Sequence, residues 1–122
     1  RMKTCDVLVI GLGPAGASAA RTAAEAGARV VAIDRKRVLG VPVQCAEFIP
    51  LPIGRCATAA GVRLQAIDAM HSVLPSGAAL DSDFRGLMVD RALFDQALAE
   101  AARAAGADLR SGTQLIDIDS AS

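Results

Sequence analysis

Aromatic residues are scarce in this chain of 122 residues, which contains no tryptophan, no tyrosine and only three phenylalanines. Alanine and aliphatic side chains must therefore fill its core, and a hydrophobic fraction of 52% is enough to build one. The length suits one domain or a piece of one.

An excess of charge is also absent, because 13 Lys and Arg residues balance 13 Asp and Glu residues. This balance argues against a nucleic-acid-binding protein and against a protein that binds anionic membranes through a basic surface. Long hydrophobic runs are missing too, since the apolar stretch at residues 5–10 is too short to cross a bilayer. We find no signal-peptide pattern and expect a cytoplasmic protein.

Residues that form disulfides or hold metals are few. The three cysteines, Cys5, Cys45 and Cys56, are an odd number without metal-ligand spacing, which argues against a disulfide framework and a zinc site. His71 is the only histidine and has no ligand partner at a suitable spacing. We therefore expect a reducing compartment and no metal site.

The first 34 residues carry the strongest pattern in the chain. An apolar, β-branched run at residues 6–10 precedes the glycine-rich sequence Gly11-Leu12-Gly13-Pro14-Ala15-Gly16. An alanine-rich helical pattern follows to residue 25, and a second apolar run at residues 28–33 ends before Asp34. This strand–turn–helix–strand unit, with an acidic residue after the second strand, predicts a dinucleotide-binding site.

Each part of the glycine-rich sequence has a predicted task. Gly11 permits the tight turn, Gly13 lets the backbone approach a pyrophosphate, and Gly16 allows the helix to pack closely. Pro14 suits the first helical turn, whose free N–H groups and positive dipole end favour phosphates. Asp34 is expected to accept hydrogen bonds from ribose hydroxyls and to disfavour NADP. The alternative is a glycine-rich turn that binds nothing.

The remainder predicts further elements of an α/β fold. Residues 35–65 are expected to be irregular because of three prolines, apart from a helical turn near residues 51–60. Residues 66–74 and 79–89 are predicted to form a hairpin. A helix is expected from the N-cap Asp90 to Gly106, followed by strands at residues 107–110 and 114–118. Because no helix would cover the last strand, we expect an N-terminal fragment of a longer protein; the alternative is a stand-alone domain.

Three segments carry a resemblance to known flavoproteins. Residues 11–20, with the pattern GxGPAGxxAA, resemble the FAD-binding fingerprint of two-dinucleotide-domain flavoproteins. Residues 40–47 resemble the PxxC[AG][GE] motif of the geranylgeranyl reductase family, and residues 91–95 are similar to the start of its RxxFDxxL segment. The last segment also occurs, more loosely, in flavoprotein monooxygenases of the para-hydroxybenzoate hydroxylase type.

The resemblance implies a Rossmann-like FAD-binding domain, with a parallel sheet and flanking helices, into which a β-sheet substrate domain is inserted. Residues 1–65 would form the βαβ dinucleotide-binding unit and the loop after it. Residues 66–89 would form a hairpin of the substrate domain, and residues 90–122 would return to the FAD-binding domain.

The resemblance also implies an activity. Reduced FAD would transfer hydride to a carbon–carbon double bond of a geranylgeranyl isoprenoid, which is either a small molecule or a lipid. The electron donor stays open between NAD(P)H and ferredoxin, and membrane contact would involve parts outside these residues. Because a later Gly-Asp motif that binds the ribitol is missing, this piece alone is expected to be inactive.

The pattern described above and the resemblance together predict the cofactor contacts, whereas neither assigns a catalytic residue. The predicted cofactor-binding residues run from the pyrophosphate through the adenosine to the flavin. They are Gly11, Gly13, Pro14, Ala15 and Gly16 at the pyrophosphate, Asp34 at the ribose, Arg35 at the adenosine, Leu115 at the adenine, Arg91 at a phosphate or the ribitol, and Cys45, Ala46 and Phe48 near the flavin.

Alternatives remain at three of these residues and for the function. Cys45 would otherwise be a small apolar filler, Arg91 would form a salt bridge, and Arg35 would belong to a solvated turn. A flavoprotein monooxygenase or halogenase is a second function, which the PxxC motif disfavours. A non-catalytic module that senses NAD or FAD is a third.

Overall fold

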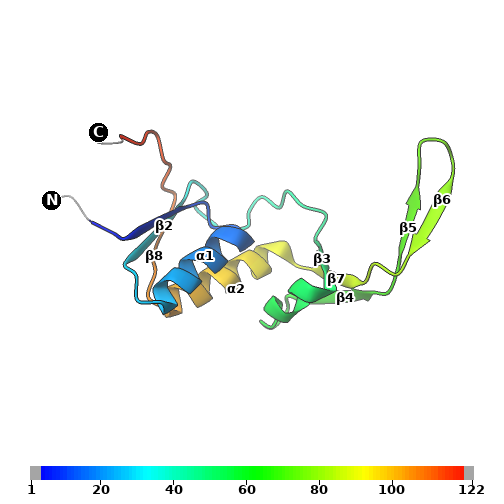
Figure 1. The fold of residues 1–122 in the computed structure, drawn as a ribbon, viewed down its shortest axis with the longest axis horizontal. Coiled ribbons are helices and arrows are strands. Elements are labelled where there is room, and N and C mark those ends of the chain that lie inside the picture. Colours follow the sequence, from blue (N-terminus) through cyan, green and yellow to red (C-terminus); the bar gives the residue numbers. More distant parts are fainter. Residues whose placement is uncertain (1–3, 120–122) are drawn as a thin grey trace.

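A three-stranded parallel sheet forms one end of the structure, a computed structural model that describes residues 4–119. Its strand order is β1 (Val7–Ile10), β2 (Val30–Asp34) and β8 (Asp108–Ser111). The helices α1 (Pro14–Glu25) and α2 (Arg91–Ala104) lie side by side next to this sheet (Figure 1). The predicted strand–turn–helix–strand unit and the second helix are therefore present.

Small side chains fill the core between the sheet and the two helices. Ala20 of α1, Ala32 of β2 and Ala102 of α2 are completely buried, and Leu12 and Val30 complete their cluster together with Ala107. Alanine at these positions lets the helices approach the strands closely, because there is little side chain to accommodate. The prediction that alanine and aliphatic residues form the core is confirmed for this cluster.

A second, antiparallel sheet has the strand order β3 (Phe48–Pro50), β7 (Gly86–Val89) and β4 (Arg63–Ile67). The short 3₁₀ helix η1 (Leu51–Cys56) packs beside it. Its core contains Ile49, Val62, Leu87 and Val89, and Phe94 of α2 lies among them. Phe94 therefore connects this sheet to the helix that also covers the parallel sheet.

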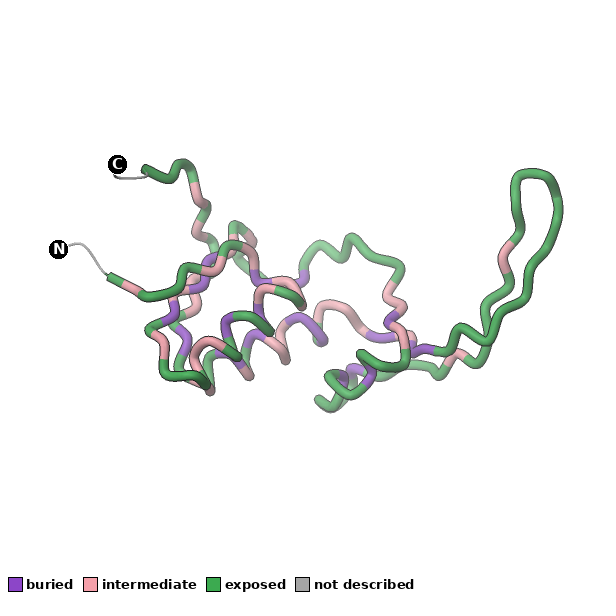
Figure 2. Tube along the Cα trace, in the orientation of Figure 1, coloured by how far each residue is buried: buried purple, intermediate pink, exposed green. Residues whose placement is uncertain are grey.

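The strands β5 (Met70–Val73) and β6 (Ala79–Ser82) form the predicted hairpin, which projects from the rest of the molecule (Figure 1). Almost all of its residues are exposed (Figure 2). His71 lies opposite Asp81 in the hairpin, and the two side chains are 2.5 Å apart.

Several predicted boundaries are wrong, and β3 was not predicted at all. The three prolines of residues 35–65 argued against a strand there, but Pro50 is tolerated because β3 is an edge strand of its sheet. The predicted helical turn at residues 51–60 is shorter and ends at Cys56. Both predicted arms of the hairpin are interrupted, one after Ile67 and the other before Gly86, so that four strands stand in place of two.

The predicted strand at residues 114–118 is also wrong. These residues have no regular secondary structure, although their polar and apolar residues alternate as in a strand. Ile116 is 94% exposed, and no described strand pairs with this segment. Alternation alone does not make a strand without a neighbour to supply the hydrogen bonds.

Among residues 4–119, no helix combines the length and the hydrophobicity that a membrane span requires.

An ion pair connects Asp6, just before β1, to Arg29, just before β2. The Arg29 guanidinium donates hydrogen bonds to both carboxylate oxygens of Asp6, at 2.7 and 3.0 Å, and the Arg29 backbone N–H donates a third at 2.8 Å. The side-chain hydrogen bond from Arg29 is the largest cause that lowers the pKa of Asp6, from 3.8 to about 2. The interaction therefore favours the folded chain wherever Asp6 is ionised.

We predict that the Asp6→Asn variant loses part of the acid sensitivity of the fold. A lowered pKa stabilises the fold above the ordinary value of 3.8, and this contribution disappears as the pH falls towards about 2. Urea denaturation between these pH values should therefore show a steeper decrease of unfolding free energy in the parent chain than in the variant. Parallel curves for the two proteins would contradict the prediction.

Candidate dinucleotide-binding site

The glycine-rich turn presents a row of backbone N–H groups at the start of α1. Gly11 leaves β1 with a φ of 95°, and Gly13 is the N-cap of α1 without any side-chain cap. The N–H groups of Gly13, Ala15 and Gly16 have no hydrogen-bond partner within residues 4–119. Since Pro14 has no N–H group, these three donors form the positive end of the helix and are suited to an anion.

Gly13 and Gly16 are glycines for different reasons. A Cβ atom on Gly16 would lie 1.8 Å from the carbonyl oxygen of Gly11, so the helix packs against the turn more closely than any side chain allows. A Cβ atom on Gly13 would meet no atom within 4 Å. The close packing predicted for Gly16 is therefore confirmed, while the space beside Gly13 is open to a ligand.

Asp34 stands at the end of β2 and joins two loops. One carboxylate oxygen accepts a hydrogen bond from the Leu12 N–H and the other accepts one from the Lys36 N–H, both at 2.8 Å. The carboxylate therefore faces the glycine-rich turn, as a ribose acceptor must. The second loop, after Asp34, is held by the same side chain.

A cavity of about 370 Å³ lies beside Asp34. Its lining includes four of the predicted cofactor residues, Gly11, Asp34, Arg35 and Leu115. Leu115 reaches this place although it is not in a strand, because the Thr113 N–H donates a 2.8 Å hydrogen bond to the Asp34 carbonyl. The structure thus brings together the residues expected around an adenosine, and their contact with a cofactor stays a prediction.

Cys45 and Arg91 meet at a second cavity, of about 190 Å³. The Arg91 guanidinium lies 2.8 Å from the Cys45 Sγ and 3.1 Å from the Asp95 carboxylate. Burial lowers the pKa of Arg91, but the hydrogen bond and the charge of Asp95 outweigh it and raise this pKa above its ordinary value. The alternative of a salt bridge is therefore realised, and a cofactor contact of Arg91 stays a prediction.

Two acidic residues of this region were missed in the sequence. Asp95 is only 8% exposed, and its position four residues after Arg91 on a helix was the available signal. Glu47 has a φ of 61°, its carbonyl accepts a hydrogen bond from Val89, and its carboxylate accepts one from the Arg91 N–H at 3.3 Å. The available signal for Glu47 was its place at the last position of the PxxC[AG][GE] pattern, where the alternative to glutamate is glycine, which adopts a positive φ freely.

Ala46 and Phe48 do not line the cavity beside Cys45. Ala46 is exposed, and Phe48 begins β3, where its ring packs on Phe84 with 5.7 Å between the ring centroids. Their predicted positions near a flavin stay predictions. Within the described part of the chain, no group of three or more His, Cys, Asp or Glu residues could hold a metal ion.

Several known proteins are similar to this chain in sequence or in fold. The family described as pyridine nucleotide-disulphide oxidoreductase matches residues 5–53. An uncharacterized protein in the nifH2 5′ region of Methanosarcina barkeri is 38% identical over 93% of the chain and 68% of its own length. A digeranylgeranylglycerophospholipid reductase of Methanothrix thermoacetophila is 36% identical over 93% of the chain and 31% of its own length.

Among solved structures, a geranylgeranyl bacteriochlorophyll reductase-like protein of Thermoplasma acidophilum aligns with a TM-score of 0.79 and 30% identity. The alignment covers 92% of the chain and 31% of that protein. The chain belongs to the geranylgeranyl reductase family of FAD-dependent oxidoreductases. The predicted family is thereby confirmed.

The fold class of this geranylgeranyl reductase family member, α/β with a Rossmann-like FAD-binding domain, is also confirmed. A myxobacterial chondrochloren halogenase, a variant of FAD-dependent halogenases, aligns with a TM-score of 0.69 at 23% identity. At that identity the likeness shows the fold alone. The chain spans less than a third of the length of the named reductase from Methanothrix thermoacetophila.

We predict that Gly16→Ala destabilises the fold. The new methyl group would overlap the Gly11 carbonyl oxygen, and relieving this overlap should cost at least about 2 kcal/mol of unfolding free energy in urea denaturation. Gly13→Ala is the matched control, because it adds the same methyl group where no atom lies within 4 Å. Equal stability of the two variants would show that α1 does not depend on this close packing.

Proposed function

We propose that the protein is an FAD-dependent oxidoreductase that reduces geranylgeranyl carbon–carbon double bonds by hydride transfer from reduced FAD. The observation that carries the proposal is the set of unpaired N–H groups at the start of α1, next to the cavity of Asp34. A diphosphate linked to an adenosine fits that combination of donors and acceptor. The relatives named as reductases of geranylgeranyl compounds supply the substrate class.

The residues present fit one half of FAD closely. The N–H groups of Gly13, Ala15 and Gly16 would bind the pyrophosphate, next to Gly11 and Pro14, and the Asp34 carboxylate would accept hydrogen bonds from the ribose. Arg35 would flank the adenosine, and the Leu115 backbone would bind the adenine. The open space beside Gly13 supports this assignment, since a phosphate needs that space.

The flavin half would lie towards Cys45. We propose that Cys45 and Ala46 flank the flavin, that Phe48 lies close by, and that Arg91 contacts a phosphate or the ribitol. The cavity beside Cys45 is mostly polar, with Lys36, Arg91 and Asp95 in its lining, which suits the polar ribitol and phosphate part of FAD.

When bound and reduced, FAD supplies the hydride, and the protein supplies binding, orientation and exclusion of water. The ion pair with Asp95, at 3.1 Å, would help to orient the Arg91 guanidinium. No described residue is proposed as the proton donor.

The substrate is proposed to be an isoprenoid lipid or small molecule, and the electron donor to be NAD(P)H or ferredoxin. The reductases named for digeranylgeranylglycerophospholipid support a lipid. Contact with a membrane surface would then bring the protein to its substrate. We propose residues 66–89 as part of the substrate domain and residues 1–65 and 90–122 as parts of the FAD-binding domain.

The function is tested with the full-length protein purified from its natural reading frame. We expect a yellow protein whose flavin, once reduced without oxygen, is reoxidised within a stopped-flow experiment when a geranylgeranyl lipid is added. Reoxidation that ignores isoprenoids but requires oxygen and an aromatic acid would indicate the monooxygenase. A colourless protein that binds NAD would indicate the sensor.

We predict that Gly13→Ala weakens cofactor binding without weakening the fold. Gly13 has a φ of −74°, which alanine adopts freely, so the unfolding free energy should change by less than about 1 kcal/mol. The methyl group would obstruct the approach of a phosphate, and we expect the dissociation constant for FAD in fluorescence titration to rise about 10-fold or more. Unchanged affinity would place the pyrophosphate elsewhere.

A further inference from the structure

The two cavities of the proposed cofactor site are joined by one irregular loop. Residues 35–47 contain neither a helix nor a strand, and they run from the cavity of Asp34 to the cavity of Cys45. Lys36, near the start of the loop, lines both cavities, and its Nζ donates a 3.2 Å hydrogen bond to the Pro42 carbonyl. The position of Cys45 relative to Asp34 therefore depends also on what holds the middle of this loop.

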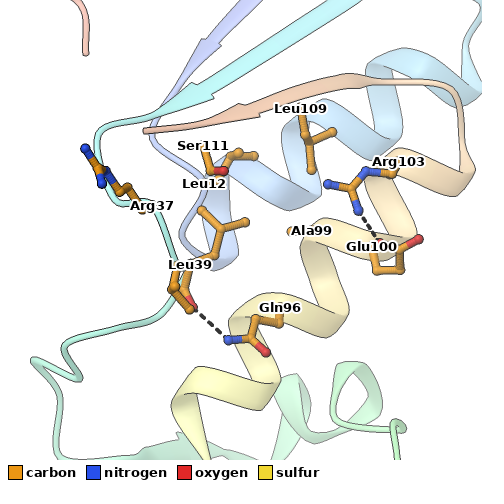
Figure 3. A pocket seen from close by; sticks show the side chains of 10 residues that line it. Leu12, Arg37, Leu39, Gln96, Ala99, Glu100, Arg103, Leu109 and Ser111 are labelled. Carbon is orange, nitrogen blue, oxygen red and sulfur yellow. Dashed lines mark hydrogen bonds and ion pairs between the residues drawn. The ribbon is translucent and has the colours of Figure 1, made fainter. Parts of the chain in front are cut away.

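The middle of this loop, at Leu39, is held by Gln96 of α2. Its Nε2 donates a 3.0 Å hydrogen bond to the Leu39 carbonyl, in a partly buried position (Figure 3). The Leu39 side chain packs against the core cluster of the parallel sheet. At the next residue, a Cβ atom on Gly40 would lie 2.8 Å from the Ala92 Cα, so the loop lies directly on the helix.

The end of the loop is held by the same helix. Arg91, which is paired with Asp95, contacts the Cys45 Sγ from a position five residues before Gln96 on the same helix. Gln96 itself lines neither of the two cavities, but a third one of about 320 Å³ that is formed partly by Leu12 and Leu39. We expect the influence of Gln96 on the cavity of Cys45 to pass through the loop, because Gln96 is hydrogen-bonded to the loop at Leu39.

We propose that Gln96 is a positioning residue that sets the place of the Cys45 segment relative to the adenosine cavity. It fixes a main-chain carbonyl, so it determines the course of the loop whatever side chains the loop carries. Loss of the Gln96 donor should disturb the flavin half of the site and leave the adenosine half, which Asp34 holds, as it is. The inference depends on the proposed function, because it assigns the two cavities to the two halves of FAD.

The test compares two variants of the full-length protein, Gln96→Met and Gln96→Lys. Methionine keeps the length of the side chain without a donor, whereas lysine restores a donor of similar reach. We expect Gln96→Met to weaken FAD binding about 5-fold while ADP binding changes less than about 2-fold. The visible circular dichroism of the bound flavin should change in Gln96→Met and return towards the parent spectrum in Gln96→Lys.

The outcomes separate this inference from the proposed function. If the parent protein binds neither ADP nor FAD, the proposed function is wrong, and the inference falls with it. If the parent binds both and Gln96→Met weakens both equally, or weakens neither, the inference alone is overturned. Equal flavin spectra of the methionine and lysine variants would also overturn it, because the donor would then be irrelevant.

Discussion

The carboxylate of Asp34 is the junction on which the proposed cofactor site depends. Its two oxygens accept hydrogen bonds from the glycine-rich turn at Leu12 and from the next loop at Lys36. Its backbone carbonyl also accepts a hydrogen bond from Thr113, which follows β8. Asp34 is thus hydrogen-bonded to the segments that follow β1, β2 and β8. The glycine-rich turn, the loop after β2 and the segment of Leu115 therefore meet at one edge of the parallel sheet.

The rest of the site is organised from α2. The apolar side of this helix covers the parallel sheet with Ala102 and enters the core of the antiparallel sheet with Phe94. Its first turns hold the loop between the two cavities through Arg91 and Gln96. A helix fixed in two cores is a rigid frame, and polar side chains on it can place a loop that has no regular structure of its own.

Local patterns in the sequence were sufficient to predict the βαβ unit and α2, because glycine spacing and a capping Asp90 act over a few residues. They were not sufficient for β3, whose Pro50 is acceptable only at the edge of a sheet. Many of the site residues were predicted from the resemblance, because local patterns do not determine contacts between distant segments. The ion pair of Arg91 with Asp95 is an example, since the burial of Asp95 depends on packing with other parts of the chain. The left-handed Glu47 depends likewise on its distant partners, Val89 and Arg91.

The direct passage from β7 into α2 has a mechanical consequence. Strand β7 ends at Val89, Asp90 caps the helix, and α2 begins at Arg91, so a single residue separates sheet from helix. The Asp90 N–H is itself bonded to the Val62 carbonyl. Because this connection contains no flexible linker, we expect any displacement of β7 to move the start of α2, and with it Arg91 beside Cys45.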